Sequence, residues 1–273
     1  MKPFTFLHGV RLCTFVFATV KIKKIHFKDP FGHSIGIKRI VIFVFGLITY
    51  YRLNHLNKLS IEGVEHLRDL PLKNVLFVSN HQTYFMDVAS FIFIFGQVKN
   101  RVQKISSSFW TLVNPKLNVF FIAALETMKS GILPRLLAYA GSVSIKRTWR
   151  EGHKEIKRNA DPKDLDKIKL AINSGWVITF PQGSTKPFIP GRRGTAHIIK
   201  DLNPIVVPIV INGFRRAFDK KGIRTKKRGT ELSIRFKQPL EFNSKDDLDN
   251  ILDRIMDGIE QSPKHKAFRK FTT

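Results

Sequence analysis

Short apolar runs separated by segments of helical pattern are the feature that most constrains the fold of this chain. The runs NVLFVS (residues 74–79), WVITFP (176–181) and IVVPIVI (205–211) are short and almost wholly apolar, as buried strands are. Residues 161–175 instead have the amphipathic pattern of a helix, with Pro162 in the first turn. Strands that alternate with helices predict an α/β fold, built on a mostly parallel sheet that is flanked by helices.

Weaker patterns complete the expected order of elements. Further strands are expected in residues 59–62, 141–147 and 231–236, and further helices in residues 84–96, 116–128, 132–141 and 244–260, the last with Ser244 as its N-cap. We expect these elements to form one α/β domain over residues 58–273, preceded by a distinct unit over residues 1–57.

Residues 1–57 alternate apolar and basic blocks. The apolar run 40–51 is shorter than the ~20 residues that a spanning helix needs, and basic residues flank it on both sides. We interpret the segment as a pair of helices that lie in one leaflet of a membrane, with their basic side chains at the headgroups. An uncleaved signal anchor and a helical hairpin within the core are alternatives.

The charge balance of the chain points to an anionic partner. Lys and Arg number 47 against 21 Asp and Glu, which gives a formal net charge of +26. Such an excess suits anionic lipid headgroups, an acidic carrier protein or nucleic acid. Several of the 24 phenylalanines lie in apolar clusters beside lysines and not in RNA-stacking motifs, so we favour a membrane surface or a carrier over nucleic acid. The single cysteine, Cys13, excludes an intramolecular disulfide and a cysteine-based metal site.

The first candidate for chemistry is a histidine at the end of the strand predicted over residues 74–79. His81 lies just beyond that strand, and Asp87 comes six residues later. On one continuous helix this spacing puts the two side chains about 240° apart, so they meet only if His81 lies in a turn and Asp87 opens the next helix. The carboxylate then fixes the imidazole tautomer and leaves the other ring nitrogen to take a proton from a hydroxyl. A purely structural loop histidine is the plainer alternative.

Sequence motifs for other catalytic mechanisms are missing. The sequence contains no Gly-x-Ser-x-Gly elbow and no His-Glu-x-x-His pattern, and its other histidines are scattered. We therefore expect direct activation of a substrate hydroxyl, without a covalent acyl-enzyme and without a metal.

A second candidate site follows the strand predicted over residues 176–181. Backbone N–H groups around a glycine, together with hydroxyls and cations, form a cradle for an anion, although an ordinary turn is the alternative. Another strand end, in GSVSIKR, brings two more cations. The candidate binding residues are Phe180, Pro181, Gln182, Gly183, Ser184, Thr185, Lys186 and Arg193 at the first place, and Lys146 and Arg147 at the second.

Four motifs occur in an order that resembles one known family. NHQTYFMD, GSVSIKR, FPQGST and IVVPIVI follow one another between residues 59 and 237, and together they are similar to the motifs of the lysophosphatidic acid acyltransferase-like glycerolipid acyltransferases. The resemblance implies transfer of a fatty acyl group from acyl-CoA or acyl carrier protein to a lysolipid hydroxyl. His81 would be the general base and Asp87 its orienting acid, while Arg147 and the turn 180–185 would bind the acceptor head.

The resemblance also implies where the protein works. Family members often begin with a membrane-docking helical pair, which matches the pattern of residues 1–57. We expect a monotopic protein at the cytoplasmic face of the bacterial inner membrane, with no cofactor beyond the acyl donor.

Three departures from the family pattern bear on the acceptor. Five residues separate His81 from Asp87 where the family has four. Gln182 replaces a glutamate and cannot pair with a cation, and Thr185 replaces an arginine and offers no charge, although a nearby lysine or arginine could substitute. Three alternatives therefore stay open: an acceptor without phosphate such as a lyso-aminolipid, a hydrolase that uses water, and a non-catalytic basic membrane-binding module.

Overall fold

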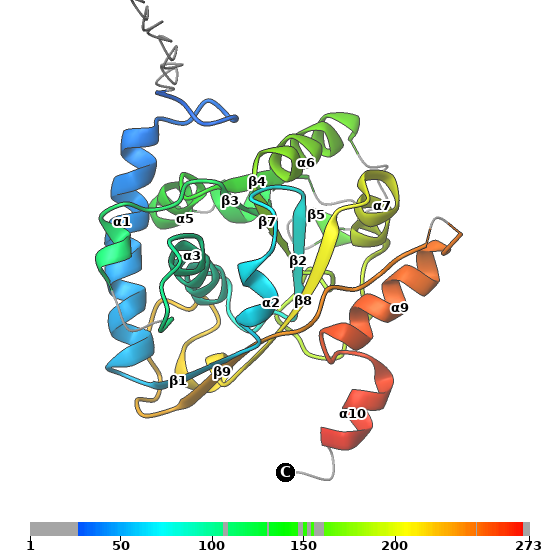
Figure 1. Cartoon of the computed structure of the whole chain (residues 1–273). Coiled ribbons are helices and arrows are strands. Elements are labelled where there is room, and N and C mark those ends of the chain that lie inside the picture. The colour runs from blue at the N-terminus through cyan, green and yellow to red at the C-terminus, as the bar shows by residue number, and fades with distance from the viewer. Residues whose placement is uncertain are drawn as a thin grey trace, which may run out of the picture.

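The computed structural model describes residues 27–105, 109–129, 131–146, 150–151, 154–155, 161–243 and 245–269. Its centre is a seven-stranded sheet with the strand order β1-β9-β8-β2-β7-β3-β4 (Figure 1). Neighbouring strands run parallel except β8 and β9, which are antiparallel, so the predicted mostly parallel α/β sheet is confirmed. The strands are β1 (Lys58–Glu62), β2 (Val75–Ser79), β3 (Val119–Ala124), β4 (Ser142–Ile145), β7 (Trp176–Thr179), β8 (Ile205–Asn212) and β9 (Glu231–Phe236), with a separate pair β5 (Arg150–Glu151) and β6 (Lys154–Glu155).

Helices cover both faces of the sheet (Figure 1). One core cluster joins the sheet to α1 and α3, and a second cluster on the opposite face joins it to α6, α7 and α9. The helices are α1 (Ile35–Asn54), α2 (Glu65–Arg68), α3 (Met86–Lys99), α4 (Leu125–Lys129), α5 (Ile132–Ala138), α6 (Pro162–Ser174), α7 (Arg193–Leu202), α8 (Phe214–Ala217), α9 (Leu248–Gly258) and α10 (Pro263–Arg269), with the 3-10 helix η1 (Trp110–Leu112).

Strand β2 shows why an unbroken apolar run predicts a central strand. All five of its residues are buried. Val75 and Phe77 belong to the cluster below α1 and α3, and Leu76 and Val78 belong to the cluster on the other face. Successive side chains of a strand point to opposite faces, so a parallel strand that is covered on both faces is apolar at every position.

The helix predicted over residues 116–128 is wrong in its first part. Val119–Ala124 form strand β3 between β7 and β4, and only the following residues, Leu125–Lys129, are helical. Phe120 and Phe121 belong to different core clusters, one on each face of the sheet. A short apolar run fits a buried strand and a buried helix equally well, and here the flanking strands decide the outcome.

The closing helix is shorter than predicted. α9 begins at Leu248 and not at residue 244, because the carboxylate of Asp247 accepts a hydrogen bond from the amide of Asn250 and caps the helix there. The expected cap, Ser244, lies outside the described residues.

α1 is the described part of the N-terminal segment. Residues 1–26, which hold the first helix of the predicted docking pair, lie outside the described residues. One side of α1 packs against α3 and buries Val41, Gly46 and Leu53. Within the part of the chain that the structure describes, no helix is both long and apolar enough to cross a bilayer.

Candidate active site

His81 and Asp87 meet at the carboxyl end of β2. His81 lies in the turn after the strand, and Asp87 is in the first turn of α3. His81 Nδ1 and Asp87 Oδ2 are 2.9 Å apart, and the Asp87 side chain is fully buried. The predicted arrangement, with one residue in a turn and the other at the start of a helix, is the one that the structure has.

The carboxylate of Asp87 is held by four donors. Besides His81 Nδ1, it accepts from the backbone N–H groups of Gln82 (2.6 Å) and Thr83 (3.0 Å) and from the hydroxyl of Thr83 (2.6 Å). An ionised carboxylate is an acceptor-only group with room for these bonds. An ionised Asp87 accepts at Nδ1, so in the neutral imidazole that nitrogen carries the hydrogen and Nε2 keeps a free lone pair.

The longer spacing between His81 and Asp87 is accommodated in the turn. The N–H groups of Tyr84 and Phe85 donate to the carbonyls of Lys220 (3.1 Å) and Lys221 (3.0 Å). These two lysines belong to residues 219–229, which we call the basic loop. The carbonyls of the basic loop therefore accept from two backbone N–H groups that come before α3. The additional residue between His81 and Asp87 leaves neither of these N–H groups without a hydrogen bond.

The ring of His81 is positioned by the neighbouring strand. Phe180 follows β7, which runs parallel to β2, so both residues lie at the same edge of the sheet. The two rings stack with centroids 3.8 Å apart and planes 23° apart. His81 Nε2 makes no hydrogen bond within the described part of the chain. The imidazole is thus held by an acid at Nδ1 and by a phenyl face, with Nε2 left for a substrate.

Residues 80–85, which we call the His81 turn, are also fixed to β8, the strand on the other side of β2. The side-chain amide of Asn80 exchanges two hydrogen bonds with the backbone of Ile211, at 2.8 and 2.9 Å. Gln82 donates to the carbonyl of Ile211 (2.9 Å) and accepts from the N–H of Arg215 (3.1 Å). Sequence reasoning missed Gln82 and Arg215, because their bonds link segments that lie some 130 residues apart in the chain.

The turn after β7 has its own internal bonds. Gly183 has a φ of 59°, in the left-handed region, and its N–H donates to the carbonyl of Phe180. The hydroxyl of Ser184 accepts from the N–H of Lys186 (3.1 Å), and the carbonyl of Thr185 accepts from the guanidinium of Arg215. Phe180 and Thr185 thus connect this turn to His81 and to the end of β8, and Pro181 is buried behind it.

Gln182 points into the protein and supports the turn from behind. Its side chain is buried, and its amide nitrogen donates to the carbonyl of Ile189 (3.0 Å) and to Gln261 Oε1 (3.4 Å). Gln261 Oε1 also accepts from the N–H of Phe188 (2.9 Å). A glutamate at position 182 would face these two acceptors, so the amide matches its surroundings.

The remaining predicted binding residues have partners other than His81. Arg193 opens α7, and its guanidinium makes two hydrogen bonds, at 2.9 and 2.7 Å, to the carboxylate of Asp249, while the N–H of the preceding Arg192 donates to the carbonyl of Pro181 in the turn after β7 (2.8 Å). Lys146 follows β4, three strands away from β2, and its ammonium lies 3.8 Å from Asp161. Arg147 lies outside the described residues.

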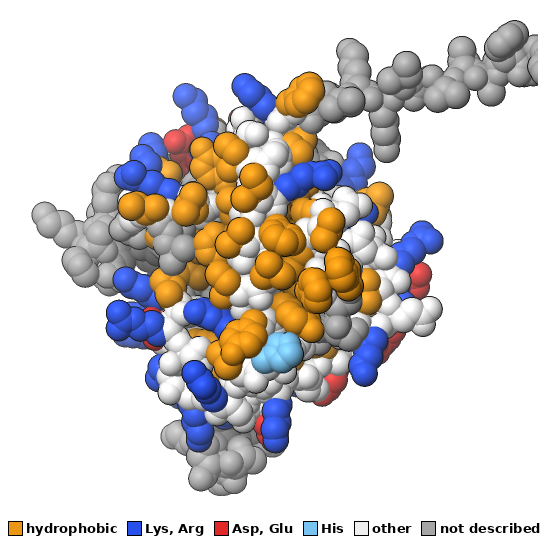
Figure 2. Space-filling model, turned by 90° about the vertical axis from the view of Figure 1, so that its left-hand side faces the viewer, with side chains coloured by type: hydrophobic (Ala, Val, Ile, Leu, Met, Phe, Trp, Pro, Cys, Tyr) orange, Lys and Arg blue, Asp and Glu red, His pale blue; other side chains and the backbone are white. Residues whose placement is uncertain are grey.

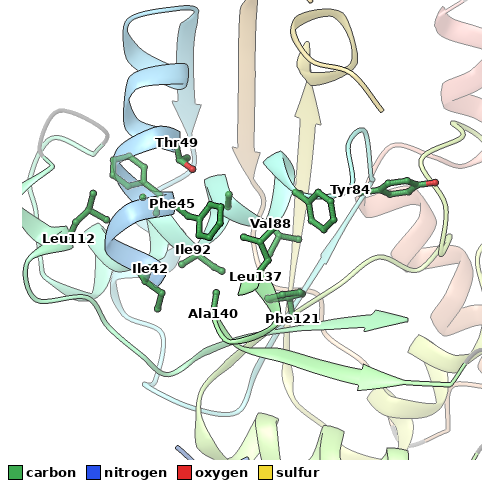
Figure 3. Close-up of a pocket in the computed structure, with 14 residues that line it drawn as sticks. Ile42, Phe45, Thr49, Tyr84, Val88, Ile92, Leu112, Phe121, Leu137 and Ala140 are labelled. Atoms are coloured by element: carbon green, nitrogen blue, oxygen red, sulfur yellow. The ribbon is translucent and has the colours of Figure 1, made fainter. Parts of the chain in front are cut away.

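An apolar pocket adjoins the His81 turn (Figure 3). It lies between α1 and α3, and Tyr84 and Phe85 of the turn form part of its wall. Its cavity volume is about 40 Å³, whereas a single buried water molecule needs about 10–15 Å³. The remaining lining residues are Ile42, Phe45, Gly46, Thr49, Val88, Ala89, Ile92, Phe93, Leu112, Phe121, Leu137 and Ala140.

A family model described as Acyltransferase matches residues 58–212, more than half of the chain. The chain belongs to the acyltransferase family. This confirms the family that the four sequence motifs resemble, and it makes the protein an acyltransferase enzyme. The matched range runs from β1 to the end of β8 and includes both His81 and the turn after β7.

Solved structures support the acyltransferase fold. Nine chains match, and one of them is the crystal structure of the 1-acyl-sn-glycerophosphate (LPA) acyltransferase from Thermotoga maritima. That enzyme is 20% identical to this chain, with a TM-score of 0.50, and the match covers 82% of this chain and 78% of the other. At this identity the likeness establishes the sheet and its flanking helices. No curated protein matches the chain.

The acyltransferase site is assembled from three strand ends. His81 follows β2, the turn 180–186 follows β7, and Arg215 follows β8, and these three strands are neighbours in the sheet. No three His, Cys, Asp or Glu side chains gather as a metal site would require within the described ranges. The arrangement combines one histidine, one buried carboxylate and a turn rich in polar groups.

Proposed function

We propose that this acyltransferase moves a fatty acyl group from a thioester donor, acyl-CoA or acyl carrier protein, to the hydroxyl of a lysophospholipid-type acceptor. The observation that carries the proposal is the 2.9 Å contact between His81 Nδ1 and buried Asp87, at the edge of the sheet in an acyltransferase domain. Both donors are anionic, and the net charge of +26 suits either of them.

In the proposed reaction, His81 acts as a general base on the acceptor. Its Nε2 takes the proton of the acceptor hydroxyl while that oxygen attacks the thioester carbonyl. The tetrahedral intermediate collapses, the carbon–sulfur bond breaks, and the imidazolium returns its proton to the leaving thiolate. Asp87 stabilises the imidazolium between these two steps. The products are an ester and a free thiol, and no residue of the protein is acylated.

The acyl chain is proposed to enter the apolar pocket between α1 and α3. Tyr84 and Phe85 of the His81 turn form part of its wall, and most of the other lining side chains are aliphatic or aromatic (Figure 3). Its volume of about 40 Å³ is too small for a long chain. The side chains of α1 and α3 would therefore separate when the chain binds.

The membrane is the proposed partner of an exposed apolar face on the same side of the molecule. Figure 2 shows hydrophobic side chains gathered on this face, with Lys and Arg side chains around them. Such an arrangement suits a protein that lies in one leaflet of an anionic membrane, with its cations at the headgroups. The cytoplasmic face of the inner membrane is part of this proposal. The apolar face consists of Ile37, Ile40, Val44, Ile48 and Tyr51 on α1, Trp110 and Val113 at η1, and Ile132 and Leu136 on α5.

The function is tested by acyl transfer from a labelled long-chain acyl-CoA, and from the matching acyl carrier protein, on vesicles that contain the full chain. The acceptors are lysolipids with phosphate, amino-acid or sugar heads, and one sample contains no acceptor. We expect labelled diacyl product that depends on the acceptor and is lost in His81→Ala. His197→Ala, which changes an exposed histidine on α7, is the matched control.

Two results would contradict the proposed function. Free fatty acid released at the same rate without acceptor would mean that the protein is a hydrolase. Equal product formation by wild type and His81→Ala, at the level of a blank, would leave a basic membrane-binding module as the better description.

A further inference from the structure

Arg215 is bonded to both the His81 turn and the turn after β7. It lies in α8, directly after β8, and β8, β2 and β7 are adjacent strands. Its backbone N–H donates to Gln82, the residue after His81. Its guanidinium donates to the carbonyl of Thr185 in the turn after β7. The side chain therefore reaches from one side of the His81 turn to the other, at the sheet edge where ligands of α/β enzymes bind.

The guanidinium of Arg215 has donors to spare and no acid beside it. Arginine carries five N–H donors, and the carbonyl of Thr185 uses only part of them. No Asp or Glu pairs with it among the described residues, whereas Arg193, Arg235 and Arg254 each have a carboxylate partner there. The residue is exposed to solvent. An arginine that is held in place through its backbone, and that lacks an internal anion, is suited to bind an external one.

Other cations surround Arg215 and raise the local positive potential. The ammonium of Lys226, in the basic loop, donates to the carbonyl of Arg215 at 3.1 Å. Lys186 is exposed and directly follows Thr185. The nearest acid along the chain, Asp219, is occupied by the N–H groups of Ile223 and Arg224. Positive groups thus converge on the turn after β7 from two segments of the chain.

We propose that Arg215 binds the anionic head of the acceptor and selects acceptors that carry a phosphate or carboxylate. This inference rests on the proposed function, because it places the acceptor head beside the turn 180–186 and its hydroxyl at His81. It also explains how Thr185 can replace the arginine of the family. The turn after β7 carries no cation at position 185, and Arg215 at the end of β8 supplies the cation instead. An acceptor without any anion is then not needed to explain the threonine.

Acyl-transfer kinetics of Arg215→Gln test the inference. The full chain is assayed in mixed micelles with three acceptors: lysophosphatidic acid, a lysolipid with a carboxylate head, and uncharged monoacylglycerol. We expect the ratio of kcat/KM for an anionic acceptor to that for monoacylglycerol to fall roughly 10- to 100-fold, mainly through KM, as one charge-assisted contact is lost. Comparison of the two anionic acceptors shows whether phosphate or carboxylate is preferred.

Two further variants separate binding from structure. Arg215→Lys keeps the charge and should restore part of the ratio. Arg216→Gln changes an exposed arginine on the same short helix and should leave the ratio unchanged. An Arg215→Gln variant that loses activity equally with all three acceptors, or that is not rescued by lysine, would show a purely structural role and overturn the inference.

A binding measurement keeps this inference separate from the proposed function. In a His81→Ala background, the dissociation constants of lysophosphatidic acid and of monoacylglycerol are measured with and without Arg215→Gln. Selective weakening for the phosphate supports Arg215 even if wild type transfers no acyl group, which would refute the proposed function alone. Equal affinities in the presence and absence of Arg215 would refute the role of Arg215 while leaving a transfer activity intact.

Discussion

The His81 turn and the apolar face, most of which lies on α1, differ in how far the chain itself supplies partners for their side chains. In the turn, Asp87 accepts four hydrogen bonds, and Asn80 and Gln82 tie the backbone to β8. On the apolar face, Ile40 and Trp110 keep 65% and 70% of their surface exposed. The polar groups of the His81 turn thus find their partners within the chain, whereas the apolar face leaves large hydrophobic side chains exposed, and a membrane is the partner that we propose for them.

The largest expected effect follows from breaking the turn. Asp87→Asn places an amide among four donors, so it disturbs the tautomer of His81 and leaves at least one buried N–H or O–H without an acceptor. We expect kcat to fall about 10³-fold, within the range known for misaligned bases. The measurement is kcat with circular dichroism of the same sample, and Asp201→Asn, an exposed position on α7, is the control. A loss below about tenfold would mean that Asp87 is not the partner of a working base.

The apolar face is tested by adding charge to it. Ile40→Glu combined with Val44→Glu should lower the partition coefficient onto anionic vesicles by at least about 10²-fold, because the two buried aliphatic side chains contribute about 1.5–3 kcal/mol each and the new carboxylates are repelled by the headgroups. Transfer to an acceptor in detergent micelles should fall far less. Leu170→Glu, at a similarly exposed position on α6, is the matched control. Equal vesicle binding by the control and by the double variant would remove the apolar face from the account.

Breaking the contact between the basic loop and the His81 turn should have a smaller effect on kcat than Asp87→Asn. Gly222 has a φ of 78°, and a Cβ there would lie 2.7 Å from the backbone nitrogen of Met86. We expect Gly222→Ala to lower the free energy of unfolding by ~1–3 kcal/mol and to reduce kcat about tenfold, since the loop then retreats from Tyr84 and Phe85. Urea unfolding and kcat check this.

A matched glycine in the same loop serves as the control. Gly229 also has a positive φ, of 67°, but a Cβ there would meet no atom within 4 Å. Gly229→Ala should therefore show only the backbone cost of about 1 kcal/mol and keep kcat. If the two alanine variants behave alike, the basic loop does not hold the turn.

The smallest expected effect on acyl transfer concerns pH, and it arises at the opposite end of the sheet from His81. Burial, together with the nearby positive charge of Lys116, lowers the pKa of Lys99 to about 7. Its ammonium lies over the ring of Trp176 and donates to the carbonyl of Asn118. The unfolded chain keeps a lysine pKa of about 10.4, so it binds more protons than the folded chain between pH 7 and 10. The free energy of unfolding should therefore rise with pH across that window and be lowest below pH 7.

Lys99→Met should flatten this rise, as urea midpoints at pH 7 and pH 9.5 would show. Lys99→Met also makes the pH dependence of acyl transfer easier to interpret. It removes a pH-dependent change in stability that would overlap the pH range in which histidines titrate. If the free energy of unfolding still rises with pH in Lys99→Met, the rise is caused by other titratable groups.

The sequence predicts the parts of this molecule whose causes are local. Strands β2, β7 and β8 are apolar at nearly every position because both faces of the sheet are covered, and the spacing of His81 and Asp87 admits only a turn followed by a helix. The strand β3 escapes prediction, since six apolar residues satisfy a helix equally well until β4 and β7 are known to flank it.

The parts that sequence reasoning misses depend on tertiary contacts. Gln182 reads as a binding residue from its motif, yet its amide is bonded to Gln261, 79 residues later. Arg193 and Arg215 look alike in sequence, as arginines that follow strand ends. Only the structure distinguishes them, because Arg193 pairs with Asp249 whereas Arg215 lies against Thr185 without an acid.

The most direct test of the account measures acyl transfer and vesicle binding in the same sample for wild type, His81→Ala and His197→Ala. We expect His81→Ala to lose acceptor-dependent transfer by at least about 10²-fold while its bound fraction equals that of wild type, and we expect His197→Ala to change neither. Transfer that continues in His81→Ala at a rate near that of wild type would contradict the claim that the pair at the end of β2 performs the chemistry.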